Sequence, residues 1–446
     1  MNHLLELAER VAAQALPGEQ VEAYVARGTT TQVKAYGGGV ESLTSASSSG
    51  IGIRVVVDQR QGFAHAGSFD EAVVAETLAD ARDNARFGER DEWFGLAEPD
   101  GVVPIEQDLW REGLAAFDPA AKVELALALE RSVLGRDDRV TGVRTATYAD
   151  SAGEGAVATS TGISAWGRGT SCWLSVSALA HDGDETKIGG GIDVGREPSE
   201  LDVEVAAADA VERAVRSFGA RPVPSQRLAI VLEPRMAASI LALAGGTLTG
   251  DRVERGRSPF ADRLGEPIAS PLLTLVDDPT NPASLAADSH DGEGLACRRN
   301  PLVVDGVLQQ FLHNSYTARR AGTRSTGSAA RGYRSTPGVG CGALAVAPGQ
   351  GTLDDLVAGV ELGLLVDSMS GFHSGVNAVS GDFSVGAEGR MIRNGQVCEP
   401  VREVTIASTL QRMLLGIEAV GADLEWLPSG TGSVSLVIGD IALGGT

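Results

Sequence analysis

Apolar side chains recur every three to four residues in several stretches of the chain, a spacing that predicts amphipathic helices. The first stretch is the clearest, because Leu4, Leu7 and Val11 fall on one helical face and Pro17-Gly18 ends the pattern. Two later stretches begin at a proline, which is favoured in the first turn of a helix. The predicted helices cover residues 3–15, 70–87, 119–134, 201–217, 234–243, 352–359 and 403–418.

Between the helices, apolar and polar residues alternate in short segments bounded by turn-forming residues, which is the pattern of half-buried strands. In the first half of the chain the predicted strands cover residues 21–26, 31–35, 39–44, 51–57, 61–65, 140–148, 155–161, 163–166 and 172–180. In the second half they cover residues 228–232, 272–276, 302–304, 306–312, 342–346, 381–389, 396–401 and 432–442. Strands therefore dominate the second half.

These elements predict an α+β protein with two main parts. We expect an N-terminal mixed α/β region at residues 1–222, built as one unit or as two subdomains of about 1–110 and 111–222. The C-terminal part, residues 223–446, should be dominated by a large antiparallel β-sheet with a few helices. The segment Ala220-Arg-Pro-Val-Pro224 is the clearest boundary, because prolines favour a linker.

Composition and charge restrict the classes of partner that this protein could bind. The 446 residues are 43% hydrophobic, which is enough to build sizeable cores, and 57 are glycine. The formal net charge is −22, so the surface should repel phosphate backbones and anionic lipids. We therefore expect neither nucleic acid nor membrane as a partner.

Several features predict a cytoplasmic location. The four cysteines form no Cys-x-x-Cys pair, which is typical of reduced thiols in a large intracellular protein. The first residues form an amphipathic helix with acids inside it, unlike a signal peptide. No apolar run reaches the roughly 18 residues that a membrane-spanning helix needs. The cysteines are Cys172, Cys297, Cys341 and Cys398.

Acidic and histidine side chains crowd one short segment. Asp288, His290, Asp291 and Glu293 lie within six residues and could together bind a cation. We favour a solvated turn between strands, because acidic turns are common and a metal site needs fixed geometry. His313 is interpreted as a polar residue with satisfied hydrogen bonds rather than a catalytic base.

No nucleophile motif is complete. Cys341 is flanked by two glycines, with no basic neighbour to lower its pKa. His373 and Ser374 are adjacent and, in an extended segment, would point to opposite sides. The sequence also lacks a phosphate-binding Walker loop.

Three groups of motifs resemble the TldD/PmbA family, also called modulators of DNA gyrase, and their order and spacing are more specific than any one motif. The first group lies between Asp291-Gly-Glu-Gly294 and Ser325-Thr-Gly-Ser-Ala-Ala-Arg331. The second is Ser380-Gly-Asp-Phe-Ser-Val-Gly386 with Ile392-Arg-Asn-Gly-Gln396, and the third is Gly421-Ala-Asp-Leu-Glu-Trp426. The Gly-Asp-Phe-Ser version is similar to the TldE (PmbA) branch.

The resemblance implies a zinc helix that this chain has lost. TldD-type subunits bind zinc through a His-Glu-x-x-x-His helix and a cysteine near the C-terminus. Alignment on Leu248-Thr-Gly-Asp251 places the two histidine positions at Leu241 and Gly246 and the catalytic glutamate position at Ala242. The cysteine position falls at residues 426–430, which contain no thiol. We therefore expect no catalytic residue, no metal ligand and no cofactor in this chain.

The family implies a division of labour between two subunits. This chain would be the non-metal-binding, TldE-like subunit of a heterodimeric zinc metallopeptidase that cleaves unfolded or modified peptides, and a TldD-like partner would carry the zinc. His313, Tyr316, Arg319 and Asp382 are the predicted peptide-binding residues. Two alternatives remain open: a homodimeric peptide-binding or assembly module without activity, and a metal-independent hydrolase that uses a thiol or hydroxyl.

Overall fold

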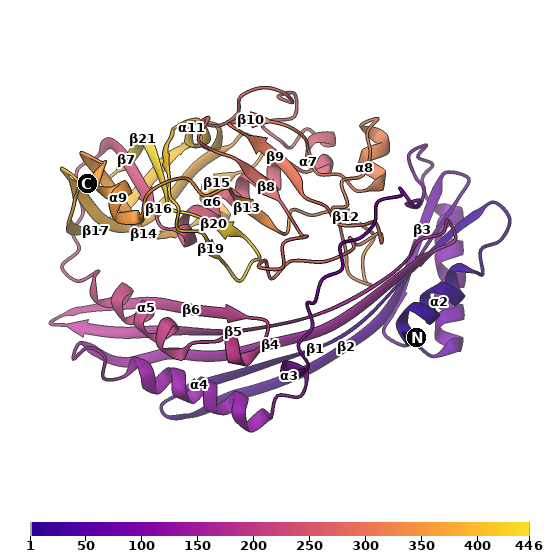
Figure 1. Ribbon diagram of the computed structural model, residues 1–446, viewed down its shortest axis with the longest axis horizontal. Helices are drawn as coiled ribbons and strands as arrows, with labels where there is room; N and C mark the ends of the chain where they lie inside the picture. The colour runs from indigo at the N-terminus through magenta and orange to yellow at the C-terminus, as the bar shows by residue number, and fades with distance from the viewer. Residues whose placement is uncertain (1, 446) are drawn as a thin grey trace.

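The computed structural model describes residues 2–445 and confirms the α+β class. Six long strands in the N-terminal half form one antiparallel sheet in the order β3-β2-β1-β4-β5-β6. Figure 1 shows this sheet as a curved lower layer, with the C-terminal half above it. The strands are β1 Glu19–Tyr36, β2 Gly39–Val57, β3 Arg60–Ala66, β4 Val140–Thr159, β5 Ser164–Asp182 and β6 Glu185–Gly195.

Helices cover the outer face of the N-terminal sheet. Alternate residues of β1, such as Val21, Val25 and Val33, are buried against them. The opposite face, here called the inner face, points toward the C-terminal half. The helices of this region are α1 His3–Ala12, α2 Glu71–Phe87, α3 Glu112–Ala115, α4 Pro119–Val133 and α5 Val203–Val215.

The strands of this sheet are longer than the sequence pattern predicts. Segments 21–26 and 31–35 are both parts of β1, and 39–44 and 51–57 are both parts of β2. The same fusion produces β4 and β5. The predicted breaks contain serine, threonine and glycine, which interrupt the hydrophobic alternation, yet the backbone pairing continues through them without a gap.

Most of the C-terminal half is also strand. Strands β14, β7, β21, β17 and β16 pair in sequence, and β14 also pairs with β16, so these five close into a ring. Most pairings are antiparallel, whereas β7 and β14 run parallel. The ring strands are β7 Gln226–Leu232, β14 Leu362–Ser370, β16 Asp382–Arg393, β17 Gln396–Thr409 and β21 Leu436–Gly444.

A second sheet and several short helices complete this half. The sheet order is β10-β9-β8-β13-β20-β19. Its strands are β8 Leu275–Asp277, β9 Asn300–Val304, β10 Val307–Leu308, β13 Leu344–Val346, β19 Glu425–Trp426 and β20 Gly432–Ser433. The remaining strands are β11 Ala329–Ala330, β12 Gly338–Val339, β15 Val376–Asn377 and β18 Ile417–Val420. The helices are α6 Pro234–Thr247, α7 Gly250–Glu254, α8 Ser315–Arg320, α9 Leu353–Ala358, α10 Phe372–Gly375 and α11 Leu410–Leu415.

The helix predicted at 403–418 is wrong over its first half. β17 continues to Thr409, and only Leu410–Leu415 is helical. Val404 and Ile406 are buried on alternate positions, and β-branched residues favour an extended strand over a helix. His373 and Ser374 also lie in the short helix α10 rather than in an extended segment.

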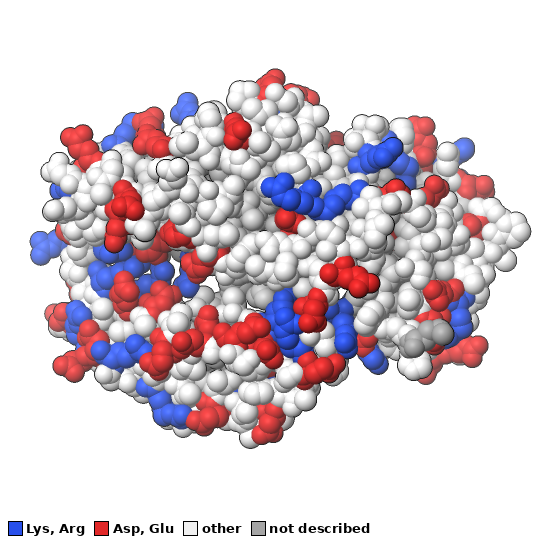
Figure 2. Space-filling view, in the orientation of Figure 1, with Lys and Arg blue, Asp and Glu red and all other residues white. Residues whose placement is uncertain are grey.

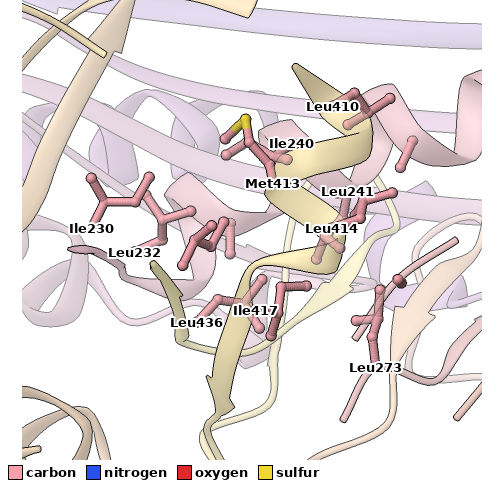
Figure 3. Close-up of a cluster of buried hydrophobic side chains, with 14 of the residues drawn as sticks. Ile230, Leu232, Ile240, Leu241, Leu273, Leu410, Met413, Leu414, Ile417 and Leu436 are labelled. Carbon is pink, nitrogen blue, oxygen red and sulfur yellow. The ribbon is translucent and has the colours of Figure 1, made fainter. Parts of the chain in front are cut away.

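The largest core lies between α6 and the ring of strands. Figure 3 shows Leu241 of α6 beside Met413 and Leu414 of α11, within a cluster of buried aliphatic side chains. Among the described helices, none combines the length and the apolar character needed to cross a bilayer.

Charged side chains are mixed along the seam between the two halves (Figure 2). At one end of the seam, Arg213 of α5 and Arg216, which directly follows α5, pair with Glu233 at N–O distances of 2.8 and 3.2 Å. Arg216 also lies 2.6 Å from Asp367 of β14. These carboxylates are about 90% buried, and the pairs connect the C-terminal end of α5 to the C-terminal half.

Candidate functional site

Helix α6 cannot bind zinc at the positions that the resemblance indicates. Leu241 is fully buried in the core, whereas Ala242 and Gly246 are exposed. None of the three side chains carries a lone pair, and residues 426–430 contain no thiol. Within residues 2–445, no group of three or more His, Cys, Asp or Glu side chains is placed to hold a metal.

One hollow lies between the inner face and the C-terminal half. This interdomain cavity has a volume of about 450 Å³ and is lined by the middle of β1, β4 and β5 on one side. On the other side it is lined by residues 285–291 and Tyr333. An adjoining inner recess of about 280 Å³ shares Tyr24, Asp288, His290 and Asp291 with it. A large cleft lined by ionisable groups is the usual place for ligand binding.

A buried charge network, made of Glu22, Arg54, Glu293 and Arg331, joins the two halves beside the cavity. Arg54 Nη2 lies 2.7 Å from Glu22 Oε2 and 3.3 Å from Glu293 Oε1. Arg331 Nη1 also pairs with Glu22. Burial alone would raise the pKa of Glu22, but Arg54 and Arg331 outweigh it and lower that pKa.

Glu293 fixes the start of helix α8 as well. The backbone N–H of Ser315 donates to Glu293 Oε2 at 2.8 Å. A carboxylate is favourable near a helix N-terminus, where backbone N–H groups lack partners inside the helix. Glu293 therefore links the inner face, through Arg54, to the segment that contains His313 and Tyr316.

The acidic segment 288–293 is not the solvated turn that the sequence indicates. Asp291 and Glu293 are buried, whereas Asp288 and His290 line the interdomain cavity. Asp291 accepts hydrogen bonds from the backbone N–H groups of Glu293, Leu295 and Ala329. Tertiary contacts with distant residues, which leave no trace in the local sequence, bury Asp291 and Glu293.

Burial shifts the ionisation of the cavity wall. It raises the pKa of Asp291 to about 7, helped by the nearby charge of Glu293 and opposed by the three N–H donors. It also raises the pKa of Asp288 and lowers the pKa of His290. The wall therefore presents a neutral imidazole and carboxyl groups that are easily protonated.

Asp291 should make stability depend on pH. Its folded-state pKa of about 7 exceeds an unfolded value near 4, so the folded state holds the proton more tightly between these limits. The stabilising contribution is complete below about pH 4 and is lost as the pH rises through about 7, at a slope of at most about 1.4 kcal/mol per pH unit.

Urea unfolding across this pH range, for the native chain and for Asp291→Asn, measures the contribution. The substitution also disturbs the three N–H contacts, so the decisive quantity is the slope against pH and not the absolute stability. The native chain should lose stability more steeply than the variant as the pH rises. Equal slopes would contradict the assignment.

Two of the predicted peptide-binding residues, Tyr316 and Arg319, lie in α8 and form hydrogen bonds with another segment of this chain. Tyr316 Oη donates to Asp91 Oδ2 at 2.7 Å, and Arg319 donates to the backbone oxygens of Trp93 and Gly95 at 2.8 and 2.7 Å. All three partners belong to the irregular connector 90–111. These contacts indicate that α8 anchors the connector.

His313 and Asp382 occupy two different environments. His313 is buried, its Nδ1 lies 3.2 Å from Thr317 Oγ1, and burial lowers its pKa. Asp382 is exposed at the start of β16 and accepts from Ser380 Oγ at 2.6 Å. Among the described residues, no hydrogen bond or ion pair joins Asp382 to His313, Tyr316 or Arg319, and none of the four lines the interdomain cavity. Their role in peptide binding stays a prediction.

A nucleophilic Cys341 finds little support in its surroundings. Burial and the adjacent Asp277 carboxylate raise the pKa of this thiol well above its usual range. The thiolate, which is the reactive form, is therefore scarce at neutral pH. Cys341 instead packs against α6, where a Cβ added to Gly245 would meet its Sγ at 2.9 Å.

Comparison with known proteins gives the same picture over the whole chain. The PmbA/TldA metallopeptidase domain 1 matches residues 21–85, the central domain matches 112–218 and the C-terminal domain matches 225–445. The metalloprotease PmbA of Escherichia coli O157:H7 is 29% identical over 95% of this chain and 92% of its own length.

Two solved structures share the fold. A protein described as a modulator of DNA gyrase from Bacteroides thetaiotaomicron is 26% identical, with a TM-score of 0.88 over 99% of this chain and 98% of that one. TldE from Thermococcus kodakarensis is 23% identical, with a TM-score of 0.89 over 99% of both chains. Sequence motifs, fold and domain matches agree, and the chain belongs to the PmbA/TldD metallopeptidase family.

Proposed function

We propose that this chain is the TldE-like subunit of a heterodimeric zinc metallopeptidase that cleaves unfolded or modified peptides. The observation that carries the proposal is the state of α6. All three positions that serve zinc chemistry in TldD-type subunits hold aliphatic or glycyl residues here, and Leu241 belongs to the core. The relatives named PmbA and TldE support the same branch.

The two subunits would divide the work. A TldD-like partner supplies the zinc, while this chain supplies part of the chamber wall. The interdomain cavity is the part of this chain best suited to that task, because it is open and bordered by both acidic and basic groups. The buried charge network fixes the spacing of its two walls.

The first test is metal content and activity. Elemental mass spectrometry of the purified chain should detect no stoichiometric zinc. The chain alone should also leave an unfolded substrate such as casein intact. Mixing with the TldD-like protein from the same organism should produce cleavage that a chelator abolishes. The control is the TldD-like protein alone, which should bind zinc but cleave slowly.

Two results would overturn this proposal. One is proteolysis by the isolated chain in the presence of chelator. The other is a stable zinc centre formed by this chain alone. Failure to form any complex with a TldD-like protein, as measured by size-exclusion chromatography, would instead favour the homodimeric peptide-binding module.

We also place the subunit in the cytoplasm. All four cysteines are free thiols in the structure, which fits a reducing compartment. A metal-independent hydrolase is disfavoured by the raised pKa of Cys341. Alkylation of this chain's four thiols before it is mixed with its partner tests that alternative, because it should leave the activity of the assembled enzyme unchanged.

A further inference from the structure

Where the inner face borders the interdomain cavity, it consists of residues that have little or no side chain. Strands β1, β4 and β5 align them in two adjacent rows across the sheet. In one row Gly28 pairs with Gly153 and Gly153 with Gly169, and in the other Ala26 pairs with Gly155 and Gly155 with Gly167. These six residues, all of which line the cavity, are here called the glycine floor.

Packing within this chain does not require glycine at the centre of the floor. A Cβ added to Gly153 would meet no atom closer than 3.6 Å, which is ordinary contact. By contrast, a Cβ added to Gly189 or Gly191 would lie about 2 Å from the backbone of α5, so those glycines are needed for helix packing. Glycine inside a strand weakens it by roughly 0.5–1 kcal/mol. A glycine that packing does not demand often marks the close approach of a ligand or another backbone.

The wall beside the floor carries polar atoms without partners. Arg331 has a fully buried side chain, and its Nε and Nη2 have no hydrogen-bond partner among the described residues. His290 Nδ1 is likewise buried without a partner in the described part of the chain. Arg331 lines the inner recess and His290 lines both hollows, together with the carboxylate of Asp288. Buried polar groups are normally paired, so unpartnered atoms beside a cavity indicate a ligand-binding wall.

The mixture of donors and acceptors indicates what the ligand is. Arg331 can donate hydrogen bonds and Asp288 can accept them. The glycine floor has no polar or large side chain that would select a particular residue of the ligand. Each unit of a polypeptide main chain carries one donor and one acceptor. An extended main chain therefore matches the wall, and a bare floor lets it lie close to the sheet.

We propose that the glycine floor binds an extended segment of unfolded polypeptide through its main chain, with Asp288, His290 and Arg331 as its polar contacts. This inference deepens the proposed function, on which it rests for the nature of the ligand. The contact uses the face of the N-terminal sheet and requires no particular sequence in the bound segment. Neither charge sign dominates the wall, so acidic and basic segments are both accommodated.

The test compares two substitutions in the same strand. Gly153→Val places a branched side chain on the floor, whereas Gly142→Val places the same side chain in β4 away from both hollows, where a Cβ meets nothing within 4 Å. Valine favours strands, so both variants should keep the sheet, which thermal unfolding checks. Fluorescein-labelled casein, an unfolded protein, is the probe, and its anisotropy reports binding to the complex with the metal removed.

Gly153→Val should raise the Kd of the probe about tenfold or more, while Gly142→Val should leave it within about twofold. Should Gly153→Val unfold, Asp288→Ala replaces it, because this side chain lines both hollows; it should weaken binding severalfold at an unchanged Tm. Native affinity in a folded Gly153→Val variant, or in Asp288→Ala, would overturn the inference.

The isolated chain separates this inference from the proposed function. Suppose that the complex cleaves its substrate while Gly153→Val and Asp288→Ala both bind the probe with native affinity. This result would disprove peptide binding at the glycine floor but would leave the proposed subunit role intact. Binding of the probe by the isolated chain, lost in Gly153→Val, would support the floor even where no active complex forms.

Discussion

Replacing Arg54 by methionine should lower the free energy of unfolding by about 3–5 kcal/mol. The guanidinium lies between two carboxylates that are almost fully buried, Glu22 and Glu293. Of the two carboxylates, Arg331 pairs with Glu22 alone, so Glu293 would keep a buried charge with no cation paired to it among the described residues. Loss of one partner from a buried pair costs far more than the pair contributes, because the remaining charge stays desolvated.

Arg86→Met is the matched control for this experiment. Arg86 pairs with Asp83 on the surface, where their side chains are 72% and 63% exposed, and such pairs contribute less than about 1 kcal/mol. Urea unfolding of the three proteins at one pH measures both effects. If Arg54→Met proves no more harmful than Arg86→Met, the charge network does not hold the two halves together.

Leu241→His should destabilise the fold by about 3–5 kcal/mol without creating a zinc centre. Leu241 is fully buried among the aliphatic side chains of Figure 3. An imidazole there would lose the apolar contacts of leucine and would bury a polar ring without a partner. Leu241, which the resemblance aligns with a zinc-binding histidine of TldD-type subunits, is part of the core in this chain.

The other two positions of the zinc helix provide the contrast. Ala242→Glu and Gly246→His lie on exposed parts of α6, and we expect each to change the stability by less than about 1 kcal/mol. The triple variant should remain free of zinc, since residues 426–430 still lack a thiol. Stoichiometric zinc in a folded triple variant would contradict this prediction and would show that these three substitutions alone restore a zinc site.

Local patterns sufficed to predict the α+β class, most helices and the resemblance to the family. Amphipathic spacing and proline at the first turn identified α4 and α6, because both signals are local. The strand lengths were underestimated, since the alternation in β1 stops after Val25 and resumes at Thr31 although the pairing does not. The interruption coincides with the glycine floor, where the sheet borders a cavity instead of a core.

The candidate site was largely hidden from the sequence. Arg54 and Glu293 lie 239 positions apart, and the local sequence around either residue contains no signal that predicts their contact. The segment 288–293 was recognised as unusual but interpreted as a solvated turn, because acidic residues are mostly exposed. Only the topology, which lays the inner face against the C-terminal half, shows why these charges can be buried.

The position of β21 in the ring has a consequence for how the protein is made. This strand, Leu436–Gly444, lies between β7 and β17 and also pairs with β18. The strands of the N-terminal sheet pair with one another and end at residue 195, and the last helix that covers them, α5, ends at residue 215, so this half can assemble while the ribosome is still translating the rest. The ring cannot close before residues 436–444 emerge, some two hundred residues after β7. Until then β7, and later β14, keep an apolar surface uncovered, so we expect the C-terminal half to depend on chaperones more than the N-terminal half does.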